Sequence, residues 1–192
     1  KVSNPTAQIN SATSEKLLNY LVKHKHWSPF EMVSACLEIE TTRDIAHQIV
    51  RHRSFSFQEF SQRYANPKEM GDMFEYAEAR LQDTKNRQNS IPTENVQLIH
   101  EWTDVQDEVI AATKKAYEWA IENGIAKEQA RKVLPEGLTK TRLYMNGTIR
   151  SWIHYIDLRG ANGTQLEHMQ IAHACADAIA KIFPNITNYT AE

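Results

Sequence analysis

The feature that most constrains the fold is a long stretch of helical apolar spacing between Glu94 and Asn123. Thr93 stands where a helix N-cap is expected, and Gly124 is typical of the residue that follows a helix. The apolar stripe consists of Val96, Ile99, Trp102, Val105, Val109, Ala112, Ala116, Tyr117, Ala120 and Ile121. About 30 helical residues extend ~45 Å, which is longer than one small domain needs. We therefore expect this helix to pack against a partner chain, which predicts an oligomer.

Length and charge limit the class of protein. The 192 residues suffice for one domain over 1–192 with a real core, and the 41% hydrophobic and 24% charged residues are typical of soluble globular proteins. The formal net charge is only -2, so overall charge does not favour binding to a nucleic-acid polymer, and phosphate recognition must be local. No apolar run approaches the ~18 residues of a membrane span.

Cysteine and histidine usage argues against a disulfide scaffold and a metal site. Cys36 and Cys175 lie far apart without metal-type spacing, which fits a reducing compartment. We expect a cytoplasmic protein, in the host cytoplasm if the source is viral. His168 and His173 are five residues apart, off one helical face, so we predict no metal.

Periodicity and capping signals predict the remaining elements. Helices are expected over 14–24, 42–50, up to 134, 148–159 and 164–183, and strands over 34–41, 54–57 and 138–146. Two capping boxes, Ser28 to Glu31 and Thr164 to Glu167, indicate helix starts. Asn146-Gly147 is typical of a hairpin turn. The polar stretch 66–93 is long for a loop, and we interpret it as a mobile flap that substrate or a neighbouring subunit orders.

The densest concentration of chemistry is the segment from Arg51 to Tyr64, which holds three arginines, a histidine, a glutamate and three serines. Guanidinium groups bind phosphate through charge-assisted bidentate hydrogen bonds, and hydroxyl groups complete the shell of an oxyanion. By charge alone, a surface cluster of salt bridges is an equally good interpretation. The phenylalanines of the segment are expected in the core.

The spacing of this segment decides between the two interpretations. Arg51-His52-Arg53, then seven residues, then Ser61, with Glu59, Arg63 and Tyr64 in register, resembles the signature of the flavin-dependent thymidylate synthases. Further matches run from Ser28 to Arg159. The resemblance implies an α+β fold, with an antiparallel sheet packed by helices and a long helix. It also implies a homotetramer whose sites lie between subunits, and an N-terminal strand upstream of Lys1 that this chain lacks.

The resemblance further implies a reaction. It is the FAD-dependent reductive methylation of dUMP to dTMP, with 5,10-methylenetetrahydrofolate as carbon donor and NADPH as reductant. Neither cysteine has a cation nearby in sequence that would lower its pKa, so we expect uracil to be activated electrostatically rather than by a thiolate. Arg159 is expected to stabilise the N3-deprotonated uracil, and Ser61 to orient and polarise the ring, because an unassisted serine is a weak nucleophile.

Ligand contacts are also implied by the resemblance. His26 is placed near flavin and folate, although by sequence alone an exposed helix-end histidine is the simpler interpretation. The residues implied for dUMP are Gln48, Arg51, Glu59, Ser61, Arg63, Arg131 and Arg159, with Arg131 acting in trans. Those implied for FAD are Ser3, Ser28, Arg51, His52, Arg53, Glu59, Thr148, Arg150 and His154. Thr148 and His154 stand where asparagine is common in the family.

Two other functions fit the same residues. A non-catalytic nucleotide- or nucleic-acid-binding module could use Arg51, Arg53 and Arg63 as a phosphate clamp, and such a protein would be colourless with strongly salt-dependent affinity. A family member that assembles but has lost turnover would bind flavin without releasing tritium from 5-labelled dUMP.

Overall fold

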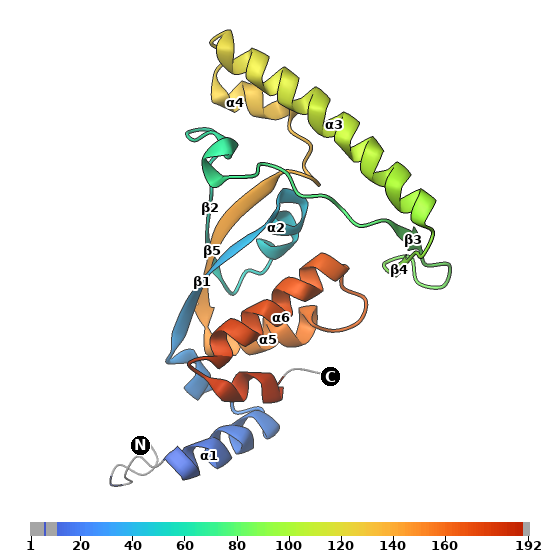
Figure 1. Cartoon of the computed structure of the whole chain (residues 1–192). Helices are drawn as coiled ribbons and strands as arrows, with labels where there is room; N and C mark the ends of the chain where they lie inside the picture. Colours follow the sequence, from blue (N-terminus) through green and yellow to red (C-terminus); the bar gives the residue numbers. More distant parts are fainter. Residues whose placement is uncertain (1–5, 7–10, 190–192) are drawn as a thin grey trace.

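The computed structural model describes residue 6 and residues 11–189, which form an α+β structure (Figure 1). Ser3, expected at the flavin, lies outside the described residues. The α-helices are α1 (Ser11–Lys23), α2 (Arg43–Ile49), α3 (Val96–Glu122), α4 (Lys127–Ala130), α5 (Ile149–Arg159) and α6 (Leu166–Ala180). The strands are β1 (Ser34–Thr42), β2 (Ser56–Glu59), β3 (Arg80–Gln82), β4 (Ser90–Pro92) and β5 (Lys140–Thr148).

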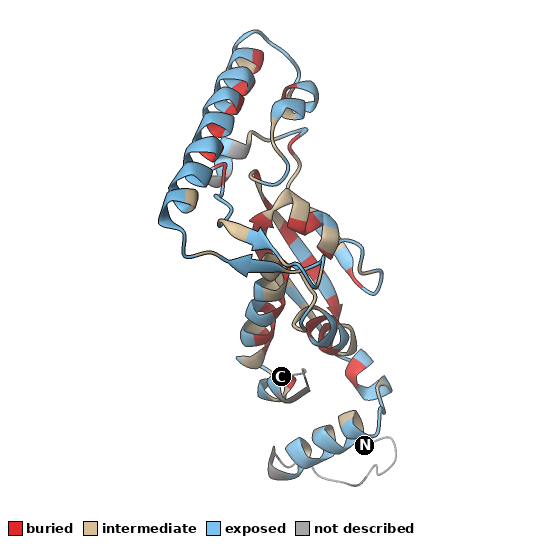
Figure 2. Cartoon of the chain, turned by 90° about the vertical axis from the view of Figure 1, so that its right-hand side faces the viewer, coloured by how far each residue is buried: buried red, intermediate tan, exposed pale blue. Residues whose placement is uncertain are grey.

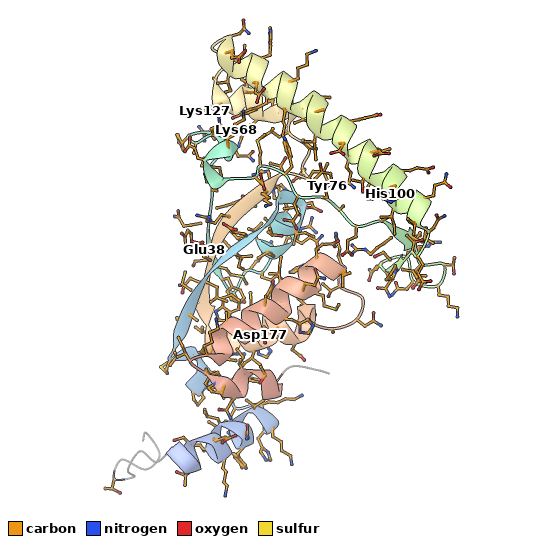
Figure 3. All side chains as sticks on the ribbon, in the orientation of Figure 1. Glu38, Lys68, Tyr76, His100, Lys127 and Asp177 are labelled. Atoms are coloured by element: carbon orange, nitrogen blue, oxygen red, sulfur yellow. The ribbon has the colours of Figure 1, made fainter. Side chains whose placement is uncertain are left out.

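Three strands form an antiparallel sheet in the order β1-β5-β2, with Ile39 opposite Leu143 in β1 and β5. Alternate residues of β5 are buried, as expected of a strand that faces a helix layer on one side. Helices α2, α5 and α6 contact the strands and cover the buried face (Figure 1). The other face is polar and exposed, with Glu38 labelled in Figure 3. The predicted antiparallel sheet packed by helices is therefore confirmed.

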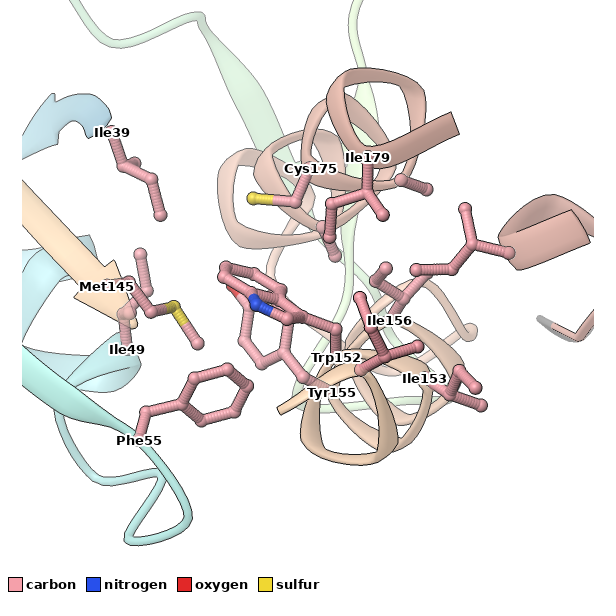
Figure 4. Packing of buried hydrophobic residues seen from close by; sticks show 14 of the residues in the cluster. Ile39, Ile49, Phe55, Met145, Trp152, Ile153, Tyr155, Ile156, Cys175 and Ile179 are labelled. Atoms are coloured by element: carbon pink, nitrogen blue, oxygen red, sulfur yellow. The ribbon is translucent and has the colours of Figure 1, made fainter. Parts of the chain in front are cut away.

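The main core lies between the sheet and α5 and α6 (Figure 4). Trp152 is fully buried, and its indole Nε1 donates a hydrogen bond to the Ala35 carbonyl at 3.0 Å. The ring of Phe55 stacks edge to face on Trp152 with centroids 4.9 Å apart. Such aromatic pairs add to the free energy gained from apolar burial, so the sheet and α5 are held in one arrangement. The core position predicted for Phe55 is confirmed.

The hairpin predicted at Asn146-Gly147 is wrong, because β5 continues through both residues to Thr148. Gly147 instead allows a close approach. A Cβ atom at this position would lie 2.4 Å from Cδ1 of Phe55. Glycine is therefore required here by the packing of the Phe55 ring against the strand rather than by a turn.

Both predicted capping boxes are also wrong. Ser28–Glu31 forms only one 3-10 turn without a side-chain cap, and the Glu31 carboxylate pairs with Arg150. Helix α6 begins at Leu166 after Gln165 and has no side-chain cap, while Glu167 pairs with Arg80. In both cases a guanidinium group from a distant part of the chain pairs with the carboxylate, as Arg and carboxylate groups do in charge-assisted hydrogen bonds.

The short helices otherwise agree with the predictions. Helices α1, α2 and α5 form over nearly the expected residues, and the side chain of Thr148 caps α5 by accepting a hydrogen bond from the Ser151 N–H. Two apolar residues whose helical spacing predicts an inward position, Leu17 of α1 and Val50 at the end of α2, are exposed, so these two predictions are wrong. The segment to 134 is divided into α4 and a 3-10 turn, Arg131–Val133.

Helix α3 forms as predicted, but it begins later and buries a different face. Its N-cap is Asn95, whose side chain accepts a hydrogen bond from the Leu98 N–H, rather than Thr93. Only one narrow line of residues is buried (Figure 2), and it consists of Gln106, Ile110, Thr113, Tyr117 and Ala120. Most of the predicted stripe is exposed, namely Val96, Ile99, Trp102, Val105, Val109, Ala112 and Ala116. The neighbouring polar residues are buried because this side of α3 contacts the segment before β3, where Gln106 binds the backbone of Ala77.

The stretch 66–93 contains structure of its own. It holds the 3-10 turn Pro67–Met70 and the β3-β4 pair, and Phe74 forms a bridge to Thr139. Met73 and Phe74 are buried against Ile110 of α3. The stretch is thus anchored to the rest of the chain at its centre, while its predicted mobility stays a prediction. Among the described residues, no helix is both long and apolar enough to cross a membrane.

Candidate functional site

The C-terminal ends of α2 and α5 bring together two of the predicted site residues. Arg159 is the last residue of α5, and His52 follows α2 by three residues. The Nε–H of Arg159 donates a hydrogen bond to Nε2 of His52 at 2.9 Å. The guanidinium group is thereby fixed through one nitrogen. Its two terminal nitrogens make no hydrogen bond or ion pair with any described residue and are available to a ligand.

A second contact joins α2 to α6. The Gln48 side chain lies 3.2 Å from Nδ1 of His168 through its Oε1 atom, and its Nε2 donates to Oε1 of Gln165 at 2.7 Å. On the other side of the imidazole, Nε2 lies 3.1 Å from the hydroxyl of Tyr155 in α5. The ring of Tyr155 also meets that of His52 edge on, with centroids 4.9 Å apart. The Gln48 pair and the Arg159 pair therefore belong to one network.

Burial keeps both histidines of this network neutral near pH 7. Desolvation and the nearby Arg159 guanidinium lower the pKa of His52. Desolvation and the same guanidinium, together with His52, lower the pKa of His168 to about 4. The Tyr155 hydroxyl stays protonated, because burial raises its pKa. Arg159 is thus a positive charge whose neighbours in this network, His52, Tyr155 and His168, are neutral.

Two further guanidinium groups follow α2. Arg51 and Arg53 are exposed, and neither makes an ion pair or side-chain hydrogen bond with any residue in the described part of the chain. Cations without a carboxylate partner are free to bind an anion. The arrangement suits the anionic ligand that the sequence predicts, because three arginines occur within a few residues of the α2 and α5 ends.

A shallow groove of about 580 Å³ gathers three other predicted residues, His26, Ser28 and Arg150. Trp27 also lines the groove, and its ring lies 4.7 Å from that of His154. The groove offers a hydroxyl group, aromatic surface and a guanidinium group, and the Arg150 guanidinium among these is already paired with Glu31. Hydroxyl groups and aromatic rings of this kind are able to contact a flavin dinucleotide. The exposure expected of a helix-end histidine is confirmed for His26, which leaves its ring accessible.

Three of the remaining predicted residues, Ser61, Arg63 and Arg131, form a separate group around α4. Arg63 lies 3.8 Å from Glu128, and Lys127 donates to the Tyr64 carbonyl, so the Ser61–Ala65 turn contacts α4, which Arg131 follows. Glu59 instead faces the sheet and accepts hydrogen bonds from Arg43 and Thr141. No ion pair or hydrogen bond between described residues connects this group to Arg159.

Sequence reasoning missed His168 and Tyr155 as members of the site. His168 is fully buried at one turn before Ala172, on the inward face of α6. A histidine in an otherwise apolar stripe was the signal, because a buried imidazole needs hydrogen-bond partners. By its spacing from His173, His168 was predicted only not to be a metal ligand. Within the described residues, no group of three or more metal-binding side chains occurs.

The cysteines have different environments. Cys175 is buried in the α6 core, and desolvation raises the pKa of its thiol to about 12. The Cys175 thiol therefore stays protonated near neutral pH. Cys36 is exposed on the polar face of the sheet, opposite Asn146.

Fold and site together define an α+β protein in which three guanidinium groups, none paired with a described carboxylate, lie near neutral histidines, an arrangement suited to a nucleotide. A family model described as thymidylate synthase complementing protein matches residues 1–185. A probable flavin-dependent thymidylate synthase of Paramecium bursaria Chlorella virus 1 is 50% identical over 186 residues, covering 97% of this chain and 84% of that protein. A flavin-dependent thymidylate synthase of Synechocystis is 47% identical over 186 residues, covering 97% and 83%. The chain therefore belongs to the flavin-dependent thymidylate synthase family.

Proposed function

We propose that this protein is a thymidylate synthase that methylates dUMP to dTMP in the cytoplasm with bound FAD. The carbon donor is 5,10-methylenetetrahydrofolate, and NADPH supplies the reducing equivalents. The family assignment supports a flavin as the cofactor and dTMP as the product. The donor and the reductant account for the balance of the reaction, because a methylene group must gain a hydride to become a methyl group.

The observation that carries this proposal is the hydrogen bond from Arg159 Nε to His52 Nε2 at 2.9 Å. His52 occurs in the segment that resembles the family signature, and Arg159 lies 107 residues later. In the proposed mechanism, the free nitrogens of Arg159 bind uracil and stabilise the negative charge that develops when N3 loses its proton. A fixed charge in a partly buried site lowers the energy of such an anion without reorganisation.

Other residues would hold the nucleotide. The exposed guanidinium of Arg51 is available for the phosphate, and Gln48 offers amide groups to the pyrimidine ring. We assign Ser61 to orientation and polarisation of uracil, since no histidine in the described part of the chain is hydrogen-bonded to its hydroxyl to act as a base. Glu59 is engaged by Arg43 and Thr141, so its carboxylate is held in place beside the sheet.

The flavin would be held by the groove that Ser28, His26 and Arg150 line, together with His52, Arg53 and His154. FAD, when bound, supplies the relay for the hydride between NADPH and the transferred carbon. Thr148 contributes indirectly, because its hydroxyl caps α5 and thereby fixes the position of Arg150 two residues later. The chain's own role is to bind and orient these ligands and to exclude water.

We further propose a homotetramer in which two chains complete each dUMP site. Within one chain, no ion pair or hydrogen bond between described residues connects the Arg63 and Arg131 group around α4 to the Arg159 network, which supports a second subunit supplying one of the two. The exposed apolar face of α3 supports this assembly, because a monomer would leave Val105, Val109 and Trp119 in water.

The test is to purify the protein and measure both colour and product. A synthase of this class is yellow, is bleached by NADPH, and forms dTMP from dUMP only when methylenetetrahydrofolate is present. A colourless protein that does not bind dUMP would overturn the proposal. A yellow protein that binds dUMP but releases no tritium from the 5-labelled nucleotide would be a member that has lost turnover.

A further inference from the structure

The fully buried imidazole of His168 has no part in the chemistry proposed above. It lies on α6 between two side chains, Gln48 of α2 and Tyr155 of α5, and contacts both through its ring nitrogens at 3.2 and 3.1 Å. A buried polar group in this position is costly unless every hydrogen bond is made. We therefore expect each hydrogen bond to the imidazole to have one defined donor and one defined acceptor.

The donor and acceptor roles can be assigned by starting from Glu167, the residue before His168. Burial tends to raise the pKa of Glu167, but hydrogen bonds from its own backbone N–H, from Arg80 and from Gln165 outweigh this and lower it. The carboxylate therefore only accepts hydrogen bonds, so the amide nitrogen of Gln165 faces it at 3.0 Å. The oxygen of Gln165 then faces Gln48, which must donate from Nε2 at 2.7 Å.

The assignment continues through Gln48. Because its Nε2 donates to Gln165, its Oε1 faces His168 and must accept from the imidazole Nδ1–H. A neutral imidazole protonated at Nδ1 accepts at Nε2, so the Tyr155 hydroxyl donates there. Reversing the Gln48 amide would place two acceptors against each other at Gln165 and two donors at His168. One orientation of Gln48 is therefore strongly preferred.

We infer that His168 is a positioning residue that fixes the amide of Gln48 for binding the pyrimidine of dUMP, with Tyr155 holding the imidazole from the other side. The inference rests on the proposed function, because it assigns Gln48 to that substrate. It adds a residue that does not touch the ligand and a tautomer, Nδ1–H, on which binding depends. It also connects Arg80 of β3 to the site, through Glu167 and Gln165.

Two substitutions at the same position separate a positioning role from a structural one. In His168→Asn the shorter amide can still donate from near the Nδ1 position to Gln48 but loses Tyr155. In His168→Gln the longer amide reaches toward Tyr155 and leaves Gln48 Oε1 without its donor. Both variants lose the imidazole ring, so both should lower the thermal unfolding temperature by similar amounts.

The measurement is the dissociation constant of dUMP by titration calorimetry on the flavin-bound protein, with visible flavin absorbance as a check on folding. We expect His168→Gln to weaken dUMP binding about 10-fold and His168→Asn by no more than about threefold, since one lost hydrogen bond accounts for such a factor. His100→Gln on the exposed, polar side of α3 is the matched control and should bind dUMP as the unsubstituted protein does.

Equal loss of dUMP affinity in the two His168 variants would overturn the inference, as would unchanged affinity in His168→Gln. Failure of the proposed function looks different, because the unsubstituted protein would then not bind dUMP at all. In that case the His100→Gln control would not bind dUMP either. Loss of binding in the control as well as in the His168 variants therefore identifies a failure of the proposed function.

Discussion

At the scale of single residues, the site depends on a charge held by neutral partners. Arg159 donates through Nε to a histidine whose own pKa is lowered, so the guanidinium is oriented without being neutralised. A carboxylate in place of His52 would cancel part of the positive charge that uracil needs. The pairing therefore preserves the field of Arg159 at the substrate while restricting its rotation.

Replacing Arg159 by alanine should abolish turnover and leave the flavin bound. The variant removes the charge that stabilises the uracil anion, and loss of one such group costs at least ~100-fold in kcat. The measurements are dTMP formation and visible flavin absorbance per chain. Arg159→Lys keeps the charge without the planar Nε donor to His52, and intermediate activity is expected. Normal turnover in the alanine variant would refute the assignment.

The neutral state of His168 predicts a dependence of stability on pH. In the unfolded chain the imidazole binds a proton below pH 6.5, whereas in the folded chain its pKa is lowered to about 4. The unfolded state therefore binds more protons between these values, and the free energy of unfolding should fall as pH falls from 6.5 to 4, by at most about 3 kcal/mol. Above pH 6.5 this contribution is constant.

Urea unfolding at fixed protein concentration across this pH range measures the effect. Carboxylates also titrate there, so the comparison is with His168→Asn, whose amide does not titrate. We expect the unfolding free energy of the variant to fall less steeply between pH 6.5 and 4. Parallel curves for the two proteins would contradict a neutral, buried His168.

At the scale of elements, β5 both contacts the helix layer and determines where the Phe55 ring packs. Its alternate residues face the helices, and Gly147 lets the Phe55 ring lie against the strand itself. The Phe55 ring cannot move away easily, since it also packs on the rings of Trp152 and Tyr155, with centroids 4.9 and 5.9 Å apart. Tyr155 in turn holds His168, so packing at this point of β5 supports the site.

Gly147→Ala is therefore expected to destabilise the protein by about 1–3 kcal/mol, the usual cost of inserting a methyl group into a packed core. Gly137→Ala is the matched control, because a Cβ atom there meets nothing within 4 Å. Its effect on the unfolding free energy should stay within about 0.5 kcal/mol. Chemical denaturation measures both variants, and equal stabilities would show that the ring moves aside at little cost.

At the scale of the whole molecule, α3 lies at one end and α1 at the other (Figure 1). The apolar residues of α3 that face solvent recur at helical spacing through Val105, Val109, Ala112 and Ala116. They adjoin the line of residues that α3 buries against its own chain. Such a face on a soluble protein indicates a protein interface, which supports the proposed tetramer.

A charge on this face should disrupt the assembly. We expect Ala116→Glu to shift the mass measured by light scattering toward smaller species and to lower activity, because a carboxylate would be buried without a partner. Ala111→Glu places the same charge on an exposed alanine outside the apolar spacing and should keep the mass unchanged. If both variants keep the mass of the unsubstituted protein, α3 does not form the interface.

The sequence by itself determined whatever depends on neighbours along the chain. Local spacing predicted α5, β1 and the existence of α3, and the arginine segment led to the family to which the chain belongs. Helical and strand periodicity are local properties, so no tertiary information was needed for them.

The tertiary structure alone decided the contacts between residues far apart in the chain. It paired Glu31 with Arg150 and Glu167 with Arg80 in place of the predicted capping boxes, and it gave Gly147 a packing role instead of a turn. It also buried His168 between two other helices. Each outcome depends on which groups the fold brings together. A buried polar group needs a hydrogen-bond partner, and that partner often comes from a distant part of the chain.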